Sequence, residues 1–362
     1  MPKMPFKPME ERMIEHEPLR YFSMFSGIGG FELGIQRAME KNKDIQRGEF
    51  KNSHTSGRMS MLGSRNKQRW GNEQQTCCIG FSEIDKYSIQ TYKKHFREHK
   101  NYGDAKTINA ERLPDFDLLV GGFPCQSFSI AGKRRGFEDV RGTLFYEIAR
   151  ILKAKRPQYF VLENVKGLLN HDKGQTFRVI LQTLGELNYQ FECGVVNSKY
   201  YGVPQNRERV FLIGSIRGQP RTKVFPLRTS NGETKELVYH QKSDREIARI
   251  YKPEGIAPTI HLKTEGWQEP KIVANCLDAN YYKGNSPSHI KSGRTRTMPF
   301  GIRRLTPLEC ERLQGFPDSW TKEGINEQGK TVLISDTQRY KQLGNAVTVN
   351  VVETIMRKLK ND

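Results

Sequence analysis

Cysteine is scarce in this sequence, and its spacing is irregular. The six cysteines among 362 residues include no C-x-x-C pair and have no histidine at a metal-ligand spacing. Disulfide scaffolds and structural zinc sites depend on such patterns. We therefore expect reduced, intracellular thiols and no bound metal. A cysteine of functional importance would act as a nucleophile or fill a small space in the core.

Long hydrophobic runs are also absent. No stretch reaches the roughly 18 apolar residues that a membrane span needs, and residues 1–20 mix Lys, Glu, Pro and His without an apolar run. Secretory signals contain such a run. We expect neither a membrane segment nor a signal peptide, and a location in the cytoplasm of a prokaryote or, for a viral protein, inside the host cell.

Acidic residues are fewer than basic ones. The chain has 59 Lys and Arg against 40 Asp and Glu, a net charge of +19. This surplus indicates a polyanionic partner, although a basic surface that only aids solubility is the alternative. Residues 41–76 hold eight basic and three acidic residues, and residues 215–300 hold 15 and eight. These two segments are therefore the first candidates for contact with nucleic acid.

Apolar runs alternate with segments of helical spacing along the first two thirds of the chain. The predicted strands are 21–25, 77–81, 116–121, 159–162 and 210–213, and the predicted helices are 31–39, 87–96, 143–153 and 175–187. Such alternation is typical of βαβ units. It predicts an α/β fold with a doubly wound, mostly parallel sheet that is covered by helices on both faces.

The alternation of predicted strands and helices ends near residue 214, and on this basis we divide the chain into three expected parts. We expect a catalytic and cofactor-binding domain over residues 1–214, with 41–76 as an inserted basic loop. A small domain would follow over 215–336, of which 215–300 is irregular. Helical order returns at Thr306-Pro307, and the segment 337–362 would return to the first domain.

A glycine cluster follows the first predicted strand. Its spacing from Gly27 to Gly34 is G-x-G-G-x-x-x-G, which differs from the G-x-G-x-x-G of dinucleotide folds. A glycine turn at the start of a helix still exposes backbone N–H groups to a ligand, and Glu83, at the end of the next strand, could bind ribose hydroxyls. A tight turn without a ligand fits this pattern equally well.

Reactive side chains follow the later strands. Cys125 comes directly after a Gly-Gly-Phe-Pro corner, and Glu163-Asn164 ends the strand at 159–162. Arg207 and Arg209 precede the strand at 210–213, where alternation points them the same way. Doubly wound folds place their sites at this edge of the sheet. Each residue alone could be structural, as a small core thiol or a surface ion pair, but their convergence favours a catalytic site.

The sequence resembles the DNA cytosine-5 methyltransferases, which use S-adenosyl-L-methionine, over nearly its whole length. The motifs that carry the resemblance are Phe25-Ser26-Gly27-Ile28-Gly29-Gly30, Gly122-Phe123-Pro124-Cys125-Gln126, Gly136-Phe137-Glu138-Asp139 through Arg141-Gly142, Glu163-Asn164-Val165, Gln205-Asn206-Arg207-Glu208-Arg209, Arg304-Leu305-Thr306-Pro307, Gln314-Gly315-Phe316-Pro317 and Gln342-Leu343-Gly344-Asn345-Ala346-Val347. The resemblance implies a Rossmann-like S-adenosylmethionine-dependent methyltransferase fold with a smaller, irregular target-recognition domain.

The resemblance also implies a covalent mechanism. Cys125 would add to C6 of cytosine, so that C5 can attack the methyl group of the cofactor. Glu163 would protonate or hydrogen-bond N3 and the exocyclic amine, and Arg209 would bind O2. Asn164 and Arg207 belong to the same two motifs. Loss of the C5 proton and elimination of the thiolate would then release 5-methylcytosine.

The cofactor residues follow from the same motifs. Glu83 would bind the ribose, Asp104 the adenine amine, and Ile84 stands where many relatives have a tryptophan that stacks on adenine. An aliphatic side chain there loses the aromatic contribution. The residues matching the methionine-side turn and the C-terminal end of the pocket are Phe25, Gly27, Gly29, Gly30, Asn345 and Val347.

Double-stranded DNA is the implied partner, and the target base must be flipped out of the duplex. Residues 126–141 would form a mobile lid over the site. We expect a monomer without metal that recognises one target of about 2–5 base pairs and protects DNA from restriction. The candidate DNA-contacting residues are Gln126, Ser129, Lys133, Arg134, Arg135 and Arg141 in the lid and Tyr282, Lys283, Arg294 and Arg296 in the recognition region.

Three other interpretations stay open at this point. A transfer-RNA methyltransferase of similar architecture would use the same chemistry on another substrate. A catalytically silent DNA-binding relative would lack activity, although Cys125, Glu163 and Arg209 are all present. A nucleotide-dependent oxidoreductase is the most remote, because the glycine spacing is wrong.

Overall fold

The computed structural model describes residues 18–40, 76–124, 143–218, 223–225, 227, 237–240, 250–251, 274–275 and 305–361. Its strands are β1 (Leu19–Met24), β2 (Thr76–Ser82), β3 (Leu118–Gly122), β4 (Tyr159–Val165), β5 (Tyr189–Asn197), β6 (Gln205–Asn206), β7 (Glu208–Ile216), β8 (Leu237–His240), β9 (Ile250–Tyr251), β10 (Ala274–Asn275), β11 (Glu323–Ile325) and β12 (Thr331–Leu333). Its α-helices are α2 (Gly30–Glu40), α4 (Lys86–His95), α5 (Leu144–Lys155), α6 (Gln175–Glu186), α8 (Pro307–Leu313), α9 (Asp336–Asn345) and α10 (Val349–Asn361). Short 3-10 helices are η1 (Ala105–Thr107), η2 (Ala110–Arg112), η4 (Lys166–Gly174) and η5 (Ser198–Tyr200).

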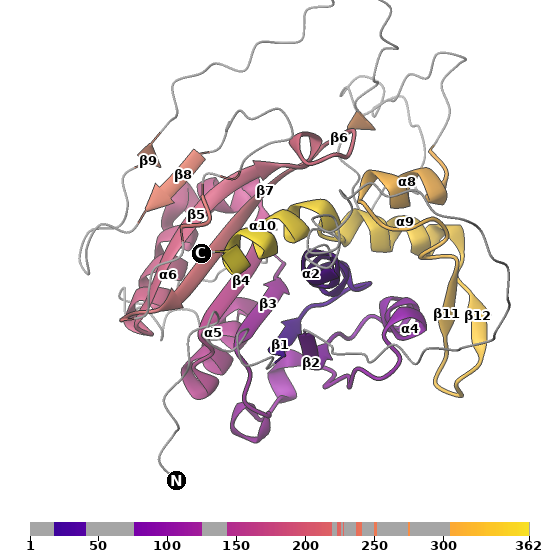
Figure 1. Cartoon of the computed structure of the whole chain (residues 1–362), viewed down its shortest axis with the longest axis horizontal. Coiled ribbons are helices and arrows are strands. Elements are labelled where there is room, and N and C mark those ends of the chain that lie inside the picture. The colour runs from indigo at the N-terminus through magenta and orange to yellow at the C-terminus, as the bar shows by residue number, and fades with distance from the viewer. Residues whose placement is uncertain are drawn as a thin grey trace, which may run out of the picture.

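Eight strands form one sheet in the order β2-β1-β3-β4-β7-β5-β8-β9 (Figure 1). The first four are parallel to one another, as predicted. β7 runs antiparallel to both of its neighbours, β4 and β5. The connection from β5 to β7, residues 198–207, is too short for the helical crossover that a parallel pair requires. β8 is likewise antiparallel to its neighbours β5 and β9. The sheet is therefore mixed, with six strands running one way and β7 and β8 reversed, and the sequence pattern did not predict β5.

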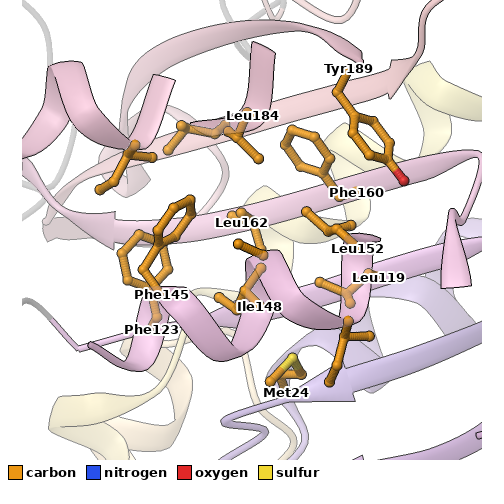
Figure 2. Close-up of a cluster of buried hydrophobic side chains, with 14 of the residues drawn as sticks. Met24, Leu119, Phe123, Phe145, Ile148, Leu152, Phe160, Leu162, Leu184 and Tyr189 are labelled. Atoms are coloured by element: carbon orange, nitrogen blue, oxygen red, sulfur yellow. The ribbon is translucent and has the colours of Figure 1, made fainter. Parts of the chain in front are cut away.

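Helices cover both faces of the sheet, as expected for a doubly wound fold. α5 and α6 pack on one face, where Ile148, Leu152 and Leu184 meet Phe160 and Leu162 (Figure 2). α2 and α10 pack on the other face, against the alternate residues of the same strands. The long apolar runs of the central strands arise because both faces are buried.

A third buried cluster joins the glycine-turn edge of the sheet to the C-terminal part of the chain. It contains Ile28 and Phe96 from the N-terminal half, with Phe316, Trp320 and Leu343 from the C-terminal part. The predicted helix start at Thr306-Pro307 is confirmed, because Thr306 is the N-cap of α8 and forms a capping box with Glu309, with Pro307 at the first helical position.

The predicted lid (126–141), most of the basic insertion (41–76) and most of the recognition region (215–300) lie outside the described residues. Within the described part of the chain, no helix has both the length and the apolar character to cross a bilayer.

Candidate active site

The carboxyl ends of the four parallel strands bring the predicted motifs to one edge of the sheet. Gly122 at the end of β3 lies beside Glu163 of β4 in the strand register. Met24 at the end of β1 pairs with Ser82 on one side and Gly121 on the other. The glycine turn, Glu83, the corner before Cys125 and Glu163 therefore share this edge because the strands are parallel and in register.

Glu163 and Arg209 form a buried ion pair. Nε of Arg209 lies 3.1 Å from Oε1 of Glu163, and their side chains are 16% and 12% exposed. Burial raises the pKa of Glu163 above its ordinary value, while the charges of Arg209 and Arg207 oppose the rise. The carboxyl group is thereby suited to hold a proton that it can share with a ligand.

Asn164 fixes the chain that leads into Cys125. Its side-chain amide donates to the carbonyl oxygen of Phe123 at 2.8 Å, and its Oδ1 accepts from the backbone N–H of Val165. Phe123 is buried and packs against Phe145. A Cβ at position 122 would stand 3.2 Å from Oε2 of Glu163. The segment Gly122-Phe123, which ends two residues before Cys125, is thus held beside the carboxylate of Glu163.

Cys125 itself lies outside the described residues, as do Gln126, Ser129, Lys133, Arg134, Arg135 and Arg141 of the lid. Tyr282, Lys283, Arg294 and Arg296 of the recognition region lie outside them too. Their predicted roles stay predictions.

Arg207 is buried and makes contacts that differ from those of Arg209. Its Nη2 donates to the carbonyl oxygens of Gly344 at 3.1 Å and Ala346 at 2.8 Å. Its charge lowers the pKa of Glu163, but its hydrogen bonds go to the end of α9. Arg207 therefore fastens the start of β7 to the segment that contains Asn345.

The glycine turn has the backbone conformation that the sequence predicts. Gly27 and Gly29 have φ of 55° and 87°, and Phe25 also has a positive φ. A Cβ at Gly29 would stand 2.4 Å from the Phe96 ring, and one at Gly30 would stand 2.7 Å from Cγ1 of Val347. Among the described residues, and apart from the two chain neighbours of Gly27, no heavy atom lies within 4 Å of a Cβ placed at this glycine. Packing fills the space around the two later glycines and leaves the space in front of Gly27 open to a ligand.

Glu83 is oriented by three backbone N–H groups. Its Oε2 accepts from Gly27 at 2.9 Å, and its Oε1 accepts from Ile84 and Asp85 at 2.8 Å each. Asn101, which the sequence analysis missed, accepts from the backbone N–H groups of Glu83 and Gly103. An asparagine two residues before a glycine is a turn signal that could have indicated it.

The remaining predicted cofactor residues lie on elements adjoining this edge. Asp104 is the N-cap residue of η1, where its Oδ1 accepts from the backbone N–H of Lys106. Ile84 is 71% exposed directly beside Glu83. Asn345 is exposed, and Val347 is buried against Gly30. An open glycine turn with two carboxylates nearby in the fold fits a ligand that carries hydroxyl and amino groups.

Comparison with known proteins connects this geometry to a family. The sequence model for the C-5 cytosine-specific DNA methylase matches residues 19–361. The type II methyltransferase M.SsoII of Shigella sonnei is 38% identical over 363 residues, covering 95% of this chain and 81% of the relative. The orphan methyltransferase M.Rho11sI of Bacillus phage rho11s is 44% identical over 529 residues, covering 94% of this chain and 97% of the relative.

A solved structure shows the same fold. The S. pombe Dnmt2 methyltransferase superimposes with a TM-score of 0.57 at 17% identity, over 94% of this chain and 98% of that one. The predicted fold class is confirmed, and the oxidoreductase alternative is wrong, because the match to a methylase family spans nearly the whole chain. The chain belongs to the C-5 cytosine-specific DNA methylase family and is a DNA cytosine-5 methyltransferase.

Proposed function

We propose that this enzyme methylates C5 of a flipped-out cytosine through a covalent bond between Cys125 and C6. The observation that carries the proposal is the buried pair of Glu163 and Arg209, beside the corner that Asn164 holds two residues before Cys125. A nucleophile that enters from this corner would meet the base next to a carboxyl group and a guanidinium group, which are the two groups that the reaction needs.

The carboxyl group of Glu163 would donate its proton or a hydrogen bond to N3 of cytosine. This withdraws electron density from C6 and favours addition of the thiolate. Arg209 orients Glu163 through its Nε and donates from Nη1 to the carbonyl of Glu208. A guanidinium has five N–H groups, so others stay available to bind O2 of the base and stabilise the charge that develops there.

The methyl donor in this proposal is S-adenosyl-L-methionine, which supplies an electrophilic methyl group on a sulfonium centre. Glu83, already fixed by three N–H groups, would accept from the ribose hydroxyls. Asp104 would accept from the adenine amine. The open face of Gly27 would receive the methionine end, with Phe25, Gly29, Gly30, Asn345 and Val347 completing the pocket.

The biological role that we propose is modification of a short duplex sequence by a monomer inside a bacterial or phage-infected cell. The relatives support it, because they are named type II and orphan methyltransferases. Flipping the base out of the duplex costs a few kcal/mol. The basic surplus supports strong phosphate contact, so duplex binding should weaken steeply with salt.

The first experiment identifies the target and then traps the intermediate. Bisulfite sequencing of DNA modified by the pure protein gives the recognition sequence, and several unrelated sequences would contradict a single target. A duplex with 5-fluorocytosine at that site should form a stable adduct, because fluorine does not leave as a proton does. Peptide mapping should place the adduct on Cys125.

Two variants make this test specific. Cys125→Ala should lose the adduct and methyl transfer but keep duplex binding. Cys77→Ala removes an exposed thiol at the start of β2 and should leave both unchanged. Near-normal turnover by C125A would overturn the covalent mechanism.

A further inference from the structure

Trp320 lies between α8 and β11, far along the chain from the glycine turn, yet it contacts that turn directly. Its indole Nε1 donates to the carbonyl oxygen of Ile28 at 3.0 Å, across 292 residues of sequence. Both residues are buried. Ile28 stands between the two left-handed glycines, Gly27 and Gly29, so the contact falls in the middle of the turn.

The turn depends on contacts of this kind. Its left-handed residues belong to no regular helix or strand, and a buried carbonyl oxygen without a donor destabilises the folded state by the desolvation of that group. The N–H of Gly27 is taken by Glu83, and the N–H of Gly29 by the carbonyl of Ser26. Trp320 supplies the donor for Ile28, so side chains anchor the turn at the peptide group before Gly27 and at the peptide group between Ile28 and Gly29.

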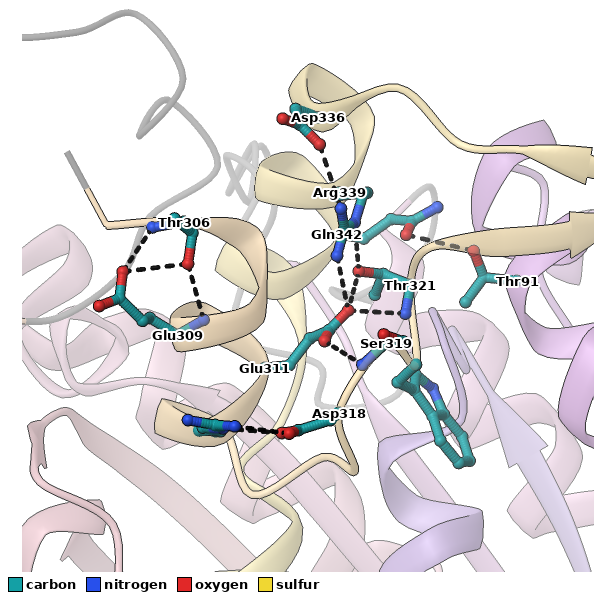
Figure 3. Close-up of polar contacts among 12 residues, drawn as sticks. Thr91, Thr306, Glu309, Glu311, Asp318, Ser319, Thr321, Asp336, Arg339 and Gln342 are labelled. Atoms are coloured by element: carbon teal, nitrogen blue, oxygen red, sulfur yellow. Dashed lines mark hydrogen bonds and ion pairs between the residues drawn. The ribbon is translucent and has the colours of Figure 1, made fainter.

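Trp320 is itself held on two sides. The ring of His95, from α4, stacks on the indole at 3.5 Å with an interplanar angle of 5°, and its Nε2 lies 2.8 Å from the carbonyl oxygen of Trp320. The next residue, Thr321, donates its N–H and hydroxyl to the buried carboxylate of Glu311. Arg339 of α9 pairs with the same carboxylate (Figure 3). The indole thus has little freedom to leave the turn.

We propose that Trp320 is a positioning residue for the cofactor, fixing the glycine turn in the conformation that receives the methionine end of S-adenosylmethionine. This rests on the proposed use of that cofactor. The C-terminal part of the chain thereby preorganises a site whose ligand-facing groups come mostly from the N-terminal half. Without the indole N–H, the turn would be less ordered in the free protein. Cofactor binding would then have to order it, and the entropy lost in doing so weakens binding.

Trp320→Phe tests this contact, because it keeps an aromatic ring for His95 but removes the N–H donor. Tyr340→Phe is the matched control. It removes a hydroxyl that donates to the carbonyl of Leu305 at 2.7 Å, in the same buried cluster but away from the turn. Both variants lose one buried hydrogen bond from a side chain to a backbone carbonyl, so a general loss of stability affects both.

Calorimetric titration of the full-length proteins with S-adenosylmethionine gives the readout without turnover. W320F should raise Kd about 3- to 10-fold, the effect of one net hydrogen bond, and Y340F should leave Kd unchanged. W320F should raise KM for the cofactor equally, with kcat at saturating cofactor unchanged. Should W320F fail to fold, Thr321→Val loosens the support of Trp320 and should raise Kd above the wild-type value.

Two results would contradict the proposal in distinguishable ways. Equal Kd values for wild type, W320F and Y340F, or for wild type and T321V where W320F does not fold, would remove the positioning role and leave the methyltransferase function intact. Failure of the wild-type protein to bind S-adenosylmethionine would refute the proposed cofactor and the positioning role together.

Discussion

Glu32 is a buried carboxyl group just after the glycine turn, and it tests how burial changes a pKa and, through it, the pH dependence of stability. It lies in the first turn of α2, has no exposed surface, and accepts a hydrogen bond from the hydroxyl of Tyr92 at 3.1 Å. Burial raises its pKa from 4.5 to about 7, and hydrogen bonds from Ser23 and Tyr92 oppose the rise. The folded protein therefore binds this proton more tightly than the unfolded chain does.

The sign and size of the effect follow from linkage. A raised pKa in the folded state means that the stabilisation is complete below pH 4.5 and is lost as the pH rises to about 7. Each tenfold change in proton affinity is worth about 1.4 kcal/mol, so the loss amounts to about 3 kcal/mol. Glu32→Gln has nearly the shape of the protonated acid and does not titrate, so it should not show this loss.

The neighbours of Glu32 do not titrate in the same range. Burial lowers the pKa of His99 to about 4 and raises that of Cys78 to about 12, and it raises the pKa of Tyr21 and Tyr92 well above 10. Between pH 5 and pH 8, Glu32 is therefore the titrating member of this buried group, and charges elsewhere cancel in the comparison of variant with wild type.

Urea unfolding at pH 5, 6, 7 and 8 measures the effect. The free energy of unfolding of E32Q, relative to wild type, should rise by about 2.5 kcal/mol from pH 5 to pH 8, because part of the full loss already occurs below pH 5. Tyr92→Phe is the paired variant. Since it removes a hydrogen bond that lowers the pKa of Glu32, it should extend the wild-type loss to higher pH. A difference between E32Q and wild type that is the same at pH 5 and pH 8 would refute the reasoning.

Three further substitutions test the site itself. In the proposed mechanism Glu163 donates a proton to the base. Glu163→Gln removes that proton, so single-turnover methyl transfer should fall about 10²- to 10⁴-fold with duplex binding kept. Because the proposed mechanism requires a protonated Glu163, wild-type transfer should decline as the pH rises through its raised pKa, and an unchanged profile in E163Q would contradict the proton-donor role. Asn164→Ala frees the carbonyl of Phe123, so adduct yield in the 5-fluorocytosine assay should fall while Kd for the cofactor holds; an undiminished yield would remove the role of this contact. Ile84→Trp adds an aromatic face beside Glu83 and should tighten cofactor binding about 2- to 10-fold, whereas weaker binding in the calorimeter would place the adenine elsewhere.

The central strands could be predicted from sequence because burial on both faces leaves a simple pattern. The apolar run at 77–81 became β2, Thr76–Ser82, and the run at 159–162 became the start of β4. β5 was not predicted, although its apolar residues alternate with Gln190 and Glu192 and Asn188, with a φ of 62°, separates it from α6. Without β5, the short connection into β7 was not visible, and neither was the reversal of that strand.

The site was predictable where a functional side chain ends a strand, and not where its partner is distant in sequence. Glu83 and Glu163 could be placed at one edge because parallel strands end there together. The contacts of Asn101 with Gly103 follow a local turn, but Trp320 reaches Ile28 across 292 residues. Nothing in the spacing of residues 305–334 indicates which peptide group the indole meets, because packing of the C-terminal part decides it.

Arg207 and Arg209 are two positions apart, yet the sequence does not predict that their side chains have different partners. Strand alternation places both on one side, and both charges act on Glu163. Only the structure shows that the hydrogen bonds of Arg207 go to carbonyl oxygens at the end of α9. Helix ends leave such oxygens without partners and carry partial negative charge, which suits a buried guanidinium. Since these carbonyls flank Asn345, Arg207 joins the proposed base side of the site to the proposed cofactor side, whereas the side chain of Arg209 contacts Glu163 and the carbonyl of Glu208.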